Sequence, residues 1–202
     1  AFKWPCGIAA DSQNRIYVTD EHLHTVFIYK DSGEYLGRWG ARGTAEGQLN
    51  GPSGIAFDQD GNVLISDSLN HRIQKFSNDG EFILSFGSQG SGDGELNLPW
   101  GLGTNSESEV FVADWGNQVL QVFDRDGNFL DLKRGEADLN AWAIEYLEAQ
   151  QDEKIARSTY VPVYDTDPDD VREISARIEP FFWDPCSVTL DENGRVYVLE
   201  TC

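Results

Sequence analysis

The stretch PSGIAFDQDGNVLISDSLNHRIQKFSNDGEFILSFG, residues 52–87, decides how the rest of the chain is interpreted. It contains four short runs rich in apolar residues, at 54–57, 63–66, 72–76 and 81–86, separated by Asp-Gly or Asn-rich turns. Runs of this length between tight turns are typical of an antiparallel β-meander. The stretch therefore predicts one small four-stranded sheet.

The same pattern recurs along the chain with a period of 47 residues. Pro5, Pro52 and Pro99 each begin an equivalent unit, and a fourth unit begins at Pro185. A period in the forties, with four strands in each unit, is typical of a β-propeller, in which four-stranded sheets called blades surround a central channel. The sequence therefore predicts an all-β fold with about three and a half blades.

The second unit also resembles a known family. Residues 67–74, Asp-Ser-Leu-Asn-His-Arg-Ile-Gln, follow a Pro-x-Gly-Ile-Ala segment and resemble an NHL repeat, which is named after its Asn-His-Leu type of triplet. The resemblance covers residues 5 to about 133 and 183–202. It implies a six-bladed β-propeller, which needs roughly 280 residues, whereas the chain has 202. We therefore expect a fragment of a longer protein, with the remaining blades missing from this chain.

The third and fourth units are 86 residues apart instead of 47, so 39 residues are inserted between them. We predict three blades in residues 1–133, an inserted and mostly helical segment in 134–182, and the start of the next blade in 183–202. Long loops on a propeller lie on a face of the ring, so the insertion is predicted to act as a lid or docking element. A degenerate blade within the insertion is the alternative, because residues 160–164 have a strand-like pattern.

Apolar spacing predicts two helices in the insertion. The first begins after Asp138, runs to about Arg157, and has Trp142 and Tyr146 on its apolar face. These two aromatic residues are candidates for contact with a ligand. The second helix covers residues 168 to about 179, with a proline at its first position and another that ends it.

The chain is strongly acidic, with 35 acidic and 15 basic side chains and a net charge of -20. This balance argues against nucleic-acid binding, which depends on contacts of Lys and Arg with phosphates. Solubility is the favoured explanation of the acidity, and an acidic docking surface is the alternative. The chain contains no run of 18 apolar residues, so no membrane span is predicted. No feature of the sequence indicates a compartment.

Candidate functional residues are those that break the repeat. Residues that recur in every blade, such as Asp20, Asp67 and Asp114 at the end of the second strand, are more simply explained by folding. On the inner strand and the channel rim, the residues that break the repeat are Cys6, His22, Trp100, Trp115 and Cys186. His24 is added as a candidate because it lies two positions after His22.

One position of the repeat concentrates these candidates. Cys6, Ser53, Trp100 and Cys186 each follow the proline that opens the innermost strand. Because innermost strands line the channel of a propeller, these side chains are predicted to cluster near one end of it. Trp100 and Trp115 would then form an aromatic wall for a protein, peptide or small ligand, with core filling as the alternative.

Cysteine and histidine provide the other candidates for chemistry. The three cysteines form neither a disulfide framework nor a C-x-x-C metal site, and Cys6 and Cys186 are predicted to lie too far apart for a disulfide. His22 and His24 would point to the same face of a strand, where they could begin a metal site with a nearby aspartate. The alternative is that His24, like His71, joins a turn to its neighbour.

Two functional classes remain. The favoured class is a non-enzymatic scaffold that binds a protein, peptide or small ligand at the channel face. The alternative is a metal-dependent hydrolase or lyase, because the NHL-type fold resembles those of calcium-dependent lactonases and zinc-dependent peptidylglycine amidating lyases. No cofactor is evident in the sequence, and calcium or zinc is expected only under the alternative. No catalytic residue or metal ligand is assigned.

Overall fold

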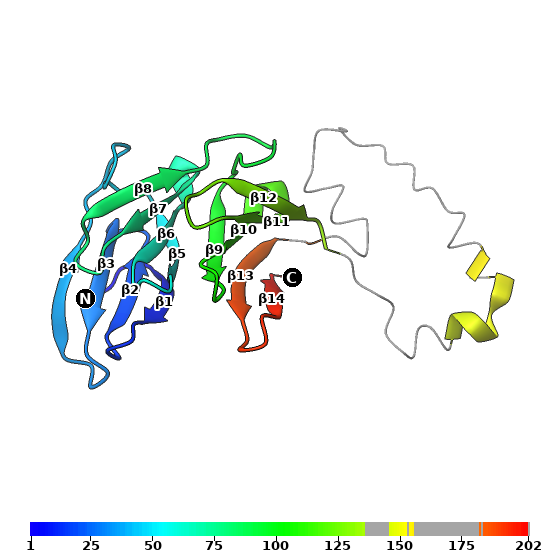
Figure 1. The fold of residues 1–202 in the computed structure, drawn as a ribbon, viewed down its shortest axis with the longest axis horizontal. Helices are drawn as coiled ribbons and strands as arrows, with labels where there is room; N and C mark the ends of the chain where they lie inside the picture. The colour runs from blue at the N-terminus through cyan, green and yellow to red at the C-terminus, as the bar shows by residue number, and fades with distance from the viewer. Residues whose placement is uncertain (136–145, 153, 156–181, 183, 202) are drawn as a thin grey trace.

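The computed structural model of the protein describes residues 1–135, 146–152, 154–155, 182 and 184–201. These residues form three four-stranded antiparallel sheets and one two-stranded sheet (Figure 1). The first sheet consists of β1 (Pro5–Ala10), β2 (Ile16–Asp20), β3 (Thr25–Tyr29) and β4 (Tyr35–Trp39). The second consists of β5 (Pro52–Phe57), β6 (Val63–Asp67), β7 (Arg72–Phe76) and β8 (Phe82–Phe86). The third consists of β9 (Pro99–Thr104), β10 (Val110–Asp114), β11 (Val119–Phe123) and β12 (Phe129–Lys133), and the fourth of β13 (Pro185–Leu190) and β14 (Val196–Glu200).

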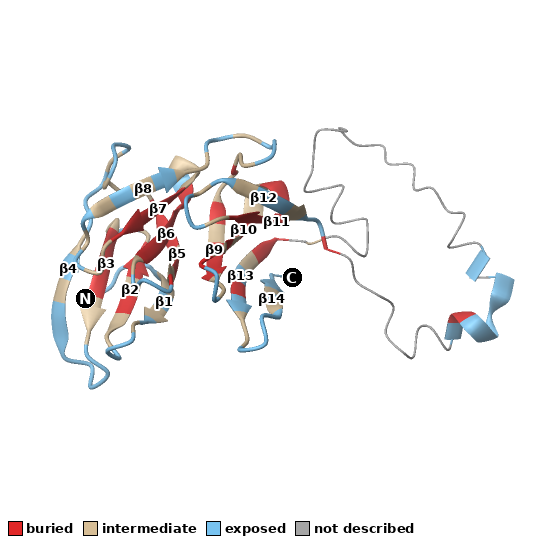
Figure 2. Cartoon of the chain, viewed as in Figure 1, coloured by how far each residue is buried: buried red, intermediate tan, exposed pale blue. Residues whose placement is uncertain are grey.

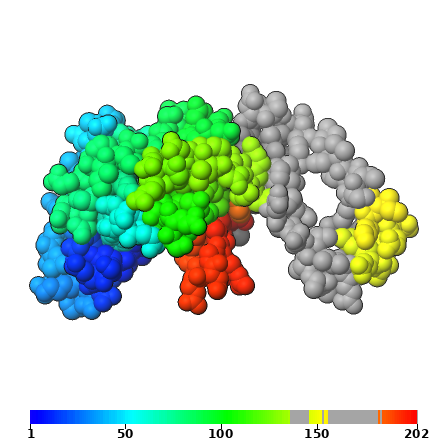
Figure 3. Space-filling view, viewed as in Figure 1, coloured from blue at the N-terminus to red at the C-terminus, as the bar shows by residue number. Residues whose placement is uncertain are grey.

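The sheets pack side by side through their first strands. β1 contacts β5, β5 contacts β9, and β9 contacts β13. The last strands, β4, β8 and β12, lie along the outside of the resulting arc (Figure 1). In the space-filling view the three larger sheets form one continuous body, from which the β13–β14 hairpin projects (Figure 3). This radial arrangement of meanders is that of propeller blades, so the predicted all-β propeller fold is confirmed.

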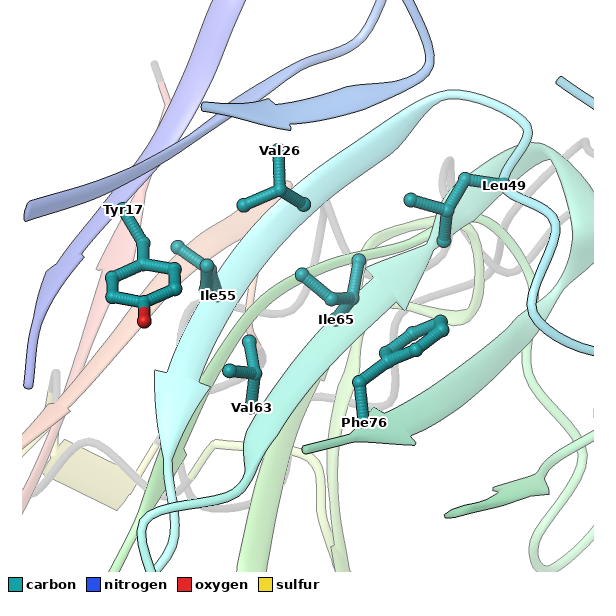
Figure 4. Close-up of a cluster of buried hydrophobic side chains, with 7 residues drawn as sticks. All are labelled: Tyr17, Val26, Leu49, Ile55, Val63, Ile65 and Phe76. Atoms are coloured by element: carbon teal, nitrogen blue, oxygen red, sulfur yellow. The ribbon is translucent and has the colours of Figure 1, made fainter. Parts of the chain in front are cut away.

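Apolar side chains fill the space between neighbouring blades. Strand β6 is buried along its whole length, whereas β4 at the outer edge is mostly exposed (Figure 2). A cluster between the first two blades is formed by Tyr17, Val26, Leu49, Ile55, Val63, Ile65 and Phe76 (Figure 4). Full burial of one such side chain contributes about 1.5–3 kcal/mol. Packing on both faces explains why the middle strands are nearly continuous apolar runs.

The glycine of each Pro-x-Gly segment allows the inner strands to approach one another. At Gly7, Gly54 and Gly101, a β-carbon would lie 2.3, 2.3 and 2.6 Å from a backbone carbonyl oxygen of the next blade. No side chain fits at such a distance, so each glycine marks a close contact of two backbones. In the fourth unit the same position holds Ser187, which is exposed.

A repeated hydrogen bond joins each blade to the start of the next. The three bonds run from Gly51 N to His24 Nδ1 (3.0 Å), from Leu98 N to His71 Nδ1 (3.2 Å) and from Asp184 N to Gln118 Oε1 (2.7 Å). The partners are 27 residues apart in the first two bonds and 66 residues apart in the third. The difference equals the 39 inserted residues, so the fourth unit keeps its register across the insertion.

The two ends of the insertion lie side by side. Phe182 N donates to Arg134 O at 2.8 Å. The Phe182 side chain packs on the buried cluster of Ala113, Leu120 and Val188, between the third and fourth blades. The chain therefore leaves the propeller and returns to it at one place. The division into three predicted parts, 1–133, 134–182 and 183–202, stays a prediction.

Only part of the first predicted helix falls within the described residues. Residues 146–149, 151–152 and 154–155 are helical, and Gln150 N donates to Tyr146 O at 3.0 Å. The start of this helix, Trp142, the second predicted helix and the alternative of a degenerate blade at 160–164 lie outside the described residues. In the part of the chain that the structure describes, no helix has the length and hydrophobicity needed to cross a membrane.

Candidate ligand site at the propeller axis

A cavity of about 540 Å³ lies where the four inner strands meet. Each inner strand contributes three consecutive residues to its wall, and Trp115 and Thr201, which directly follow β10 and β14, add two more. The residues that line the cavity are Cys6, Gly7, Ile8, Ser53, Gly54, Ile55, Trp100, Gly101, Leu102, Trp115, Cys186, Ser187, Val188 and Thr201. Four of the six axial candidates from the sequence, Cys6, Trp100, Trp115 and Cys186, are therefore brought together.

The start of each inner strand has the same irregular geometry. Pro5 pairs with Asp20, and the prolines that open β5, β9 and β13 pair with Asp67, Asp114 and Glu200 in the same way. Directly after each proline the register of the strand pair shifts, as at a β-bulge. Bulges bend a strand and re-aim its side chains. The residue after each proline accordingly lines the axial cavity.

The second and third blades differ in what they place on this wall. Ser53 and Ser68 form a hydrogen-bonded pair, with 2.6 Å between their hydroxyl oxygens. Ser68 Oγ lies 2.5 Å from Pro99 O, and Ser53 Oγ lies 2.9 Å from Trp100 O. Because each hydroxyl has one proton, one serine donates to its partner and the other donates to a carbonyl group of the third blade. In the third blade Trp100 and Trp115 occupy the positions of these serines. A polar link between blades is thus replaced by two large aromatic side chains in the cavity wall.

Both thiols in the wall are held in their protonated form. Cys6 Sγ lies 3.6 Å from Glu21 Oε2, and burial together with this carboxylate raises the pKa of Cys6 to about 11. Burial, with a smaller effect of Asp184 and Glu200, also raises the pKa of Cys186. Both residues are free cysteines. Since the thiolate is the nucleophilic form, this environment does not activate either sulfur.

The carboxylate that ends the second strand has a structural role in the second blade. Asp67 is fully buried. It accepts hydrogen bonds from Asn50 N (2.6 Å), Asn70 Nδ2 (2.8 Å), Arg72 Nε (2.8 Å) and Gln74 Nε2 (2.9 Å). One side chain therefore joins the preceding connector, the turn and the third strand. The prediction that this repeated aspartate stabilises the fold is confirmed.

Asp114 occupies the equivalent position in the third blade. The hydrogen bonds described for its carboxylate come from neutral groups. It accepts hydrogen bonds from Asn97 N (2.8 Å), Asn117 Nδ2 (2.7 Å) and Gln121 Nε2 (2.9 Å). Val119 stands where the second blade has Arg72. Burial of the carboxyl group raises the pKa of Asp114 to about 6, although these hydrogen bonds act in the opposite direction.

The raised pKa of Asp114 predicts a pH-dependent stability. The folded protein holds this proton up to about pH 6, whereas the unfolded chain releases it near pH 3.8. The contribution of Asp114 is therefore full below about pH 4 and is lost as the pH rises to about 6. Wild type should lose up to about 3 kcal/mol relative to Asp114→Asn over this interval. Urea unfolding of both proteins at several pH values measures the difference.

Asp124 provides a control of opposite sign for this measurement. Hydrogen bonds from the side chain and backbone of Asn128 lower the pKa of Asp124, which lies in an exposed turn. The contribution of Asp124 is therefore present at neutral pH and is lost on acidification. If Asp114→Asn and wild type keep a constant difference in stability from pH 4 to pH 6.5, the assignment of a raised pKa to Asp114 is wrong.

His22 and His24 are not part of the cavity wall. The prediction that they share a face of a strand is wrong, because both lie in the turn between β2 and β3. His24 has a φ of 53°, and His71 in the next blade has a φ of 54°. Both use Nδ1 to accept the hydrogen bond that joins their blade to the next. The alternative, a histidine that joins a turn to its neighbour, is confirmed.

No metal site is assigned to these histidines. His22 is exposed. In residues 1–135 and the other described segments, no three His, Cys, Asp or Glu side chains gather in a group that could hold a metal ion.

Sequence reasoning missed two residues of the cavity wall that carry hydroxyl groups. Ser187 replaces the glycine of the three earlier inner strands, and this break in the repeat is visible in the sequence. Thr201 follows β14, and no feature of the sequence singled it out. Tyr146 is exposed on the helical segment and does not line the cavity. The ligand-binding role of the remaining candidates stays a prediction.

The arrangement of blades and the axial cavity define a protein of the β-propeller class. The family model described as NHL repeat matches residues 2–29 and 49–76, which are parts of the first and second blades. The chain thus contains two NHL repeats within a β-propeller fold. A search of curated protein sequences gave no significant match.

Solved structures confirm the fold at low sequence identity. The chain is similar to a virginiamycin B lyase from Staphylococcus aureus, with a TM-score of 0.57 and 11% identity over 98% of this chain and 49% of that one. It is also similar to a gluconolactonase from Xanthomonas campestris, with a TM-score of 0.57 and 17% identity over 97% of this chain and 54% of that one. The hydrazine synthase of Kuenenia stuttgartiensis has a TM-score of 0.57 and 12% identity over 97% of this chain and 42% of that one. The chain spans about half the length of these structures, and the likeness shows the fold alone.

Proposed function

We propose that this propeller is a binding protein that holds a small ligand, or a side chain of a peptide, in the axial cavity. One observation carries the proposal. The residues that depart from the repeat at equivalent positions, Cys6, Trp100 and Cys186, come from three different blades and line a single cavity together with Trp115. Equivalent positions of a propeller lie around one axis, so the support for a ligand comes from the change of residue type at these positions.

The chemistry of the wall suits binding better than nucleophilic catalysis. A volume of about 540 Å³ lies in the range of small-molecule sites, which are mostly apolar with a few polar groups. The Trp100 and Trp115 rings supply apolar contact area, and Ser187 and Thr201 supply hydroxyl groups. The thiols are protonated at neutral pH, so the wall holds no activated sulfur nucleophile.

Binding of a neutral aromatic dye tests the proposed site. Nile red should bind with a stoichiometry of one and with blue-shifted emission, because most of the cavity wall is apolar. Trp100→Ala and Trp115→Ala should each weaken binding at least tenfold, since a buried aromatic contact is worth about 1.5–3 kcal/mol. The control is Trp4→Ala, because Trp4 is 63% exposed and lies outside the cavity wall. Equal binding by wild type and both cavity variants would contradict the proposal.

The metal-dependent hydrolase or lyase remains the alternative, and metal analysis separates the two functions. Our proposal expects no stoichiometric metal in the purified protein after dialysis. Calcium or zinc retained at one equivalent per chain would contradict a pure binding function. The measurement needs no knowledge of the substrate.

A further inference from the structure

We propose that the axial cavity selects organic cations, with an ammonium or guanidinium group held against Trp100 and Trp115. This inference rests on the proposed binding function and names the class of ligand. It is based on three features of the described residues: the carboxylates around the cavity, the neutral groups that bind them, and the aromatic wall.

Acidic residues lie next to the start of each inner strand in the strand pairs, beside the cavity wall. The proline that opens each inner strand pairs with an acidic residue of the second strand: Asp20, Asp67, Asp114 or Glu200. The residues that follow each proline line the cavity. Glu21 adds a fifth carboxylate, and its Oε2 atom lies 3.6 Å from Cys6 Sγ in the wall. The wall itself contains no Lys, Arg or His. The first, third and fourth units thus place a carboxylate beside the wall, and in the second unit Arg72 offsets the charge of Asp67. These acidic residues and Glu21 are called the rim below.

Neutral groups bind two of these carboxylates. Asp20 accepts hydrogen bonds from the backbone N–H groups of Lys3, Trp4 and Leu23. The donors to Asp114 are likewise a backbone N–H group and two side-chain amides. Asp67 does have a cationic partner, Arg72. Hydrogen bonds from neutral donors stabilise a carboxylate without cancelling its charge, so the rim keeps a net negative charge at neutral pH.

The negative charge of the rim acts at the cavity wall itself. Carboxylates contribute to raising the pKa of Cys6 on one side of the cavity and of Cys186 on the other, after burial as the larger cause. A field that disfavours a thiolate at both sides also disfavours an anionic ligand between them. The same field attracts a cation, and the net charge of -20 adds to this attraction at long range.

The aromatic wall adds an attraction that is specific for organic cations. Tryptophan provides the strongest cation–π interaction among the aromatic side chains, about 0.5–2 kcal/mol. Trp100 and Trp115 both line the cavity and are both only partly exposed. A quaternary or primary ammonium group is desolvated more easily than a metal ion and presents apolar surface to the rings. The combination favours organic cations over neutral ligands of the same shape.

Choline and its neutral isostere 3,3-dimethyl-1-butanol test this selectivity. The two molecules have nearly the same shape and differ by one positive charge, and both can be titrated while the fluorescence of the tryptophans or displacement of Nile red is measured. We expect choline to bind at least tenfold more tightly than the alcohol. Its affinity should fall with added sodium chloride, whereas the affinity of the alcohol should not.

Variants separate the contributions of charge and aromatic wall. Trp100→Leu and Trp115→Leu should reduce the preference for choline, and Glu21→Gln should weaken choline binding a few-fold without affecting the alcohol. The matched control is Glu46→Gln, which removes the same charge from an exposed connector. Its choline affinity should be that of wild type.

The outcomes distinguish the inference from the function on which it rests. Nile red bound in the cavity, with choline no better than the alcohol, overturns cation selectivity and leaves the binding function standing. Equal weakening of choline binding by Glu21→Gln and Glu46→Gln also overturns the role of the rim. Failure of the dye, choline and the alcohol to bind overturns both.

Discussion

Replacement of Asp67 with alanine is expected to destabilise the protein by about 3–5 kcal/mol, the range typical of a broken buried ion pair. Asp67 is fully buried and forms an ion pair with Arg72 at 2.8 Å. Its removal also leaves the amide groups of Asn70 and Gln74 without this acceptor, and a buried donor left without a partner costs about 1–3 kcal/mol. Unfolding in urea, followed by tryptophan fluorescence, measures the change.

The matched control is Asp60→Ala. Asp60 also forms an ion pair, with Arg125 at 2.5 Å, but both side chains are more than half exposed. Exposed pairs contribute about 0–1 kcal/mol because water and salt screen the charges. A loss of less than about 1 kcal/mol in Asp67→Ala would contradict the structural role of this carboxylate.

Replacement of Gly54 with alanine is expected to destabilise the protein by about 1–3 kcal/mol, the usual cost of overpacking. The added β-carbon would lie 2.3 Å from Trp100 O and 3.0 Å from Leu102 N, and both are backbone atoms. Neither atom can move without shifting β9 away from β5. Because Trp100 lies in the cavity wall, the variant should also weaken Nile red binding. Urea unfolding and the dye titration measure the two effects.

Gly37→Ala is the control for this substitution. Gly37 lies in the outer strand β4, with no heavy atom within 4 Å of the position that a β-carbon would take. Alanine there reduces the entropy of the unfolded chain and should be neutral or stabilise by about 0.4–1 kcal/mol. Similar losses in Gly54→Ala and Gly37→Ala would show that the effect comes from glycine replacement in general and not from the contact between inner strands.

Much of the fold was predictable because each blade repeats the same local chemistry. The prolines, the Asp-Gly turns and the apolar runs recur with one period. The structural role predicted for each of them in one copy can therefore be compared with the other copies. The position of Cys6, Trp100 and Cys186 on the cavity wall followed from the same comparison, since equivalent residues of a propeller lie at equivalent distances from its axis. Comparison of copies also separated the structural Asp67 from residues that break the repeat.

Other features depend on surroundings that the repeat does not encode. The strand predicted for His22 and His24 is a turn, because His24 adopts a left-handed conformation to accept a hydrogen bond from the next blade. The sequence shows Val119 in place of Arg72, but the raised pKa of Asp114 follows only from its burial and from the neutral donors around it. The sequence therefore lacks the distances between groups of neighbouring blades and the burial of each side chain.

By itself, the sequence determined the all-β class, the blade boundaries and the residues that depart from the repeat, because turn chemistry and apolar periodicity act over short stretches of chain. Only the tertiary structure decided that the space between Cys6, Trp100, Trp115 and Cys186 is an open cavity of about 540 Å³, where the sequence left core filling as the alternative. These residues are up to 180 positions apart in the chain. Their proximity arises from the packing of β1, β5, β9 and β13, which the glycines of the Pro-x-Gly segments permit.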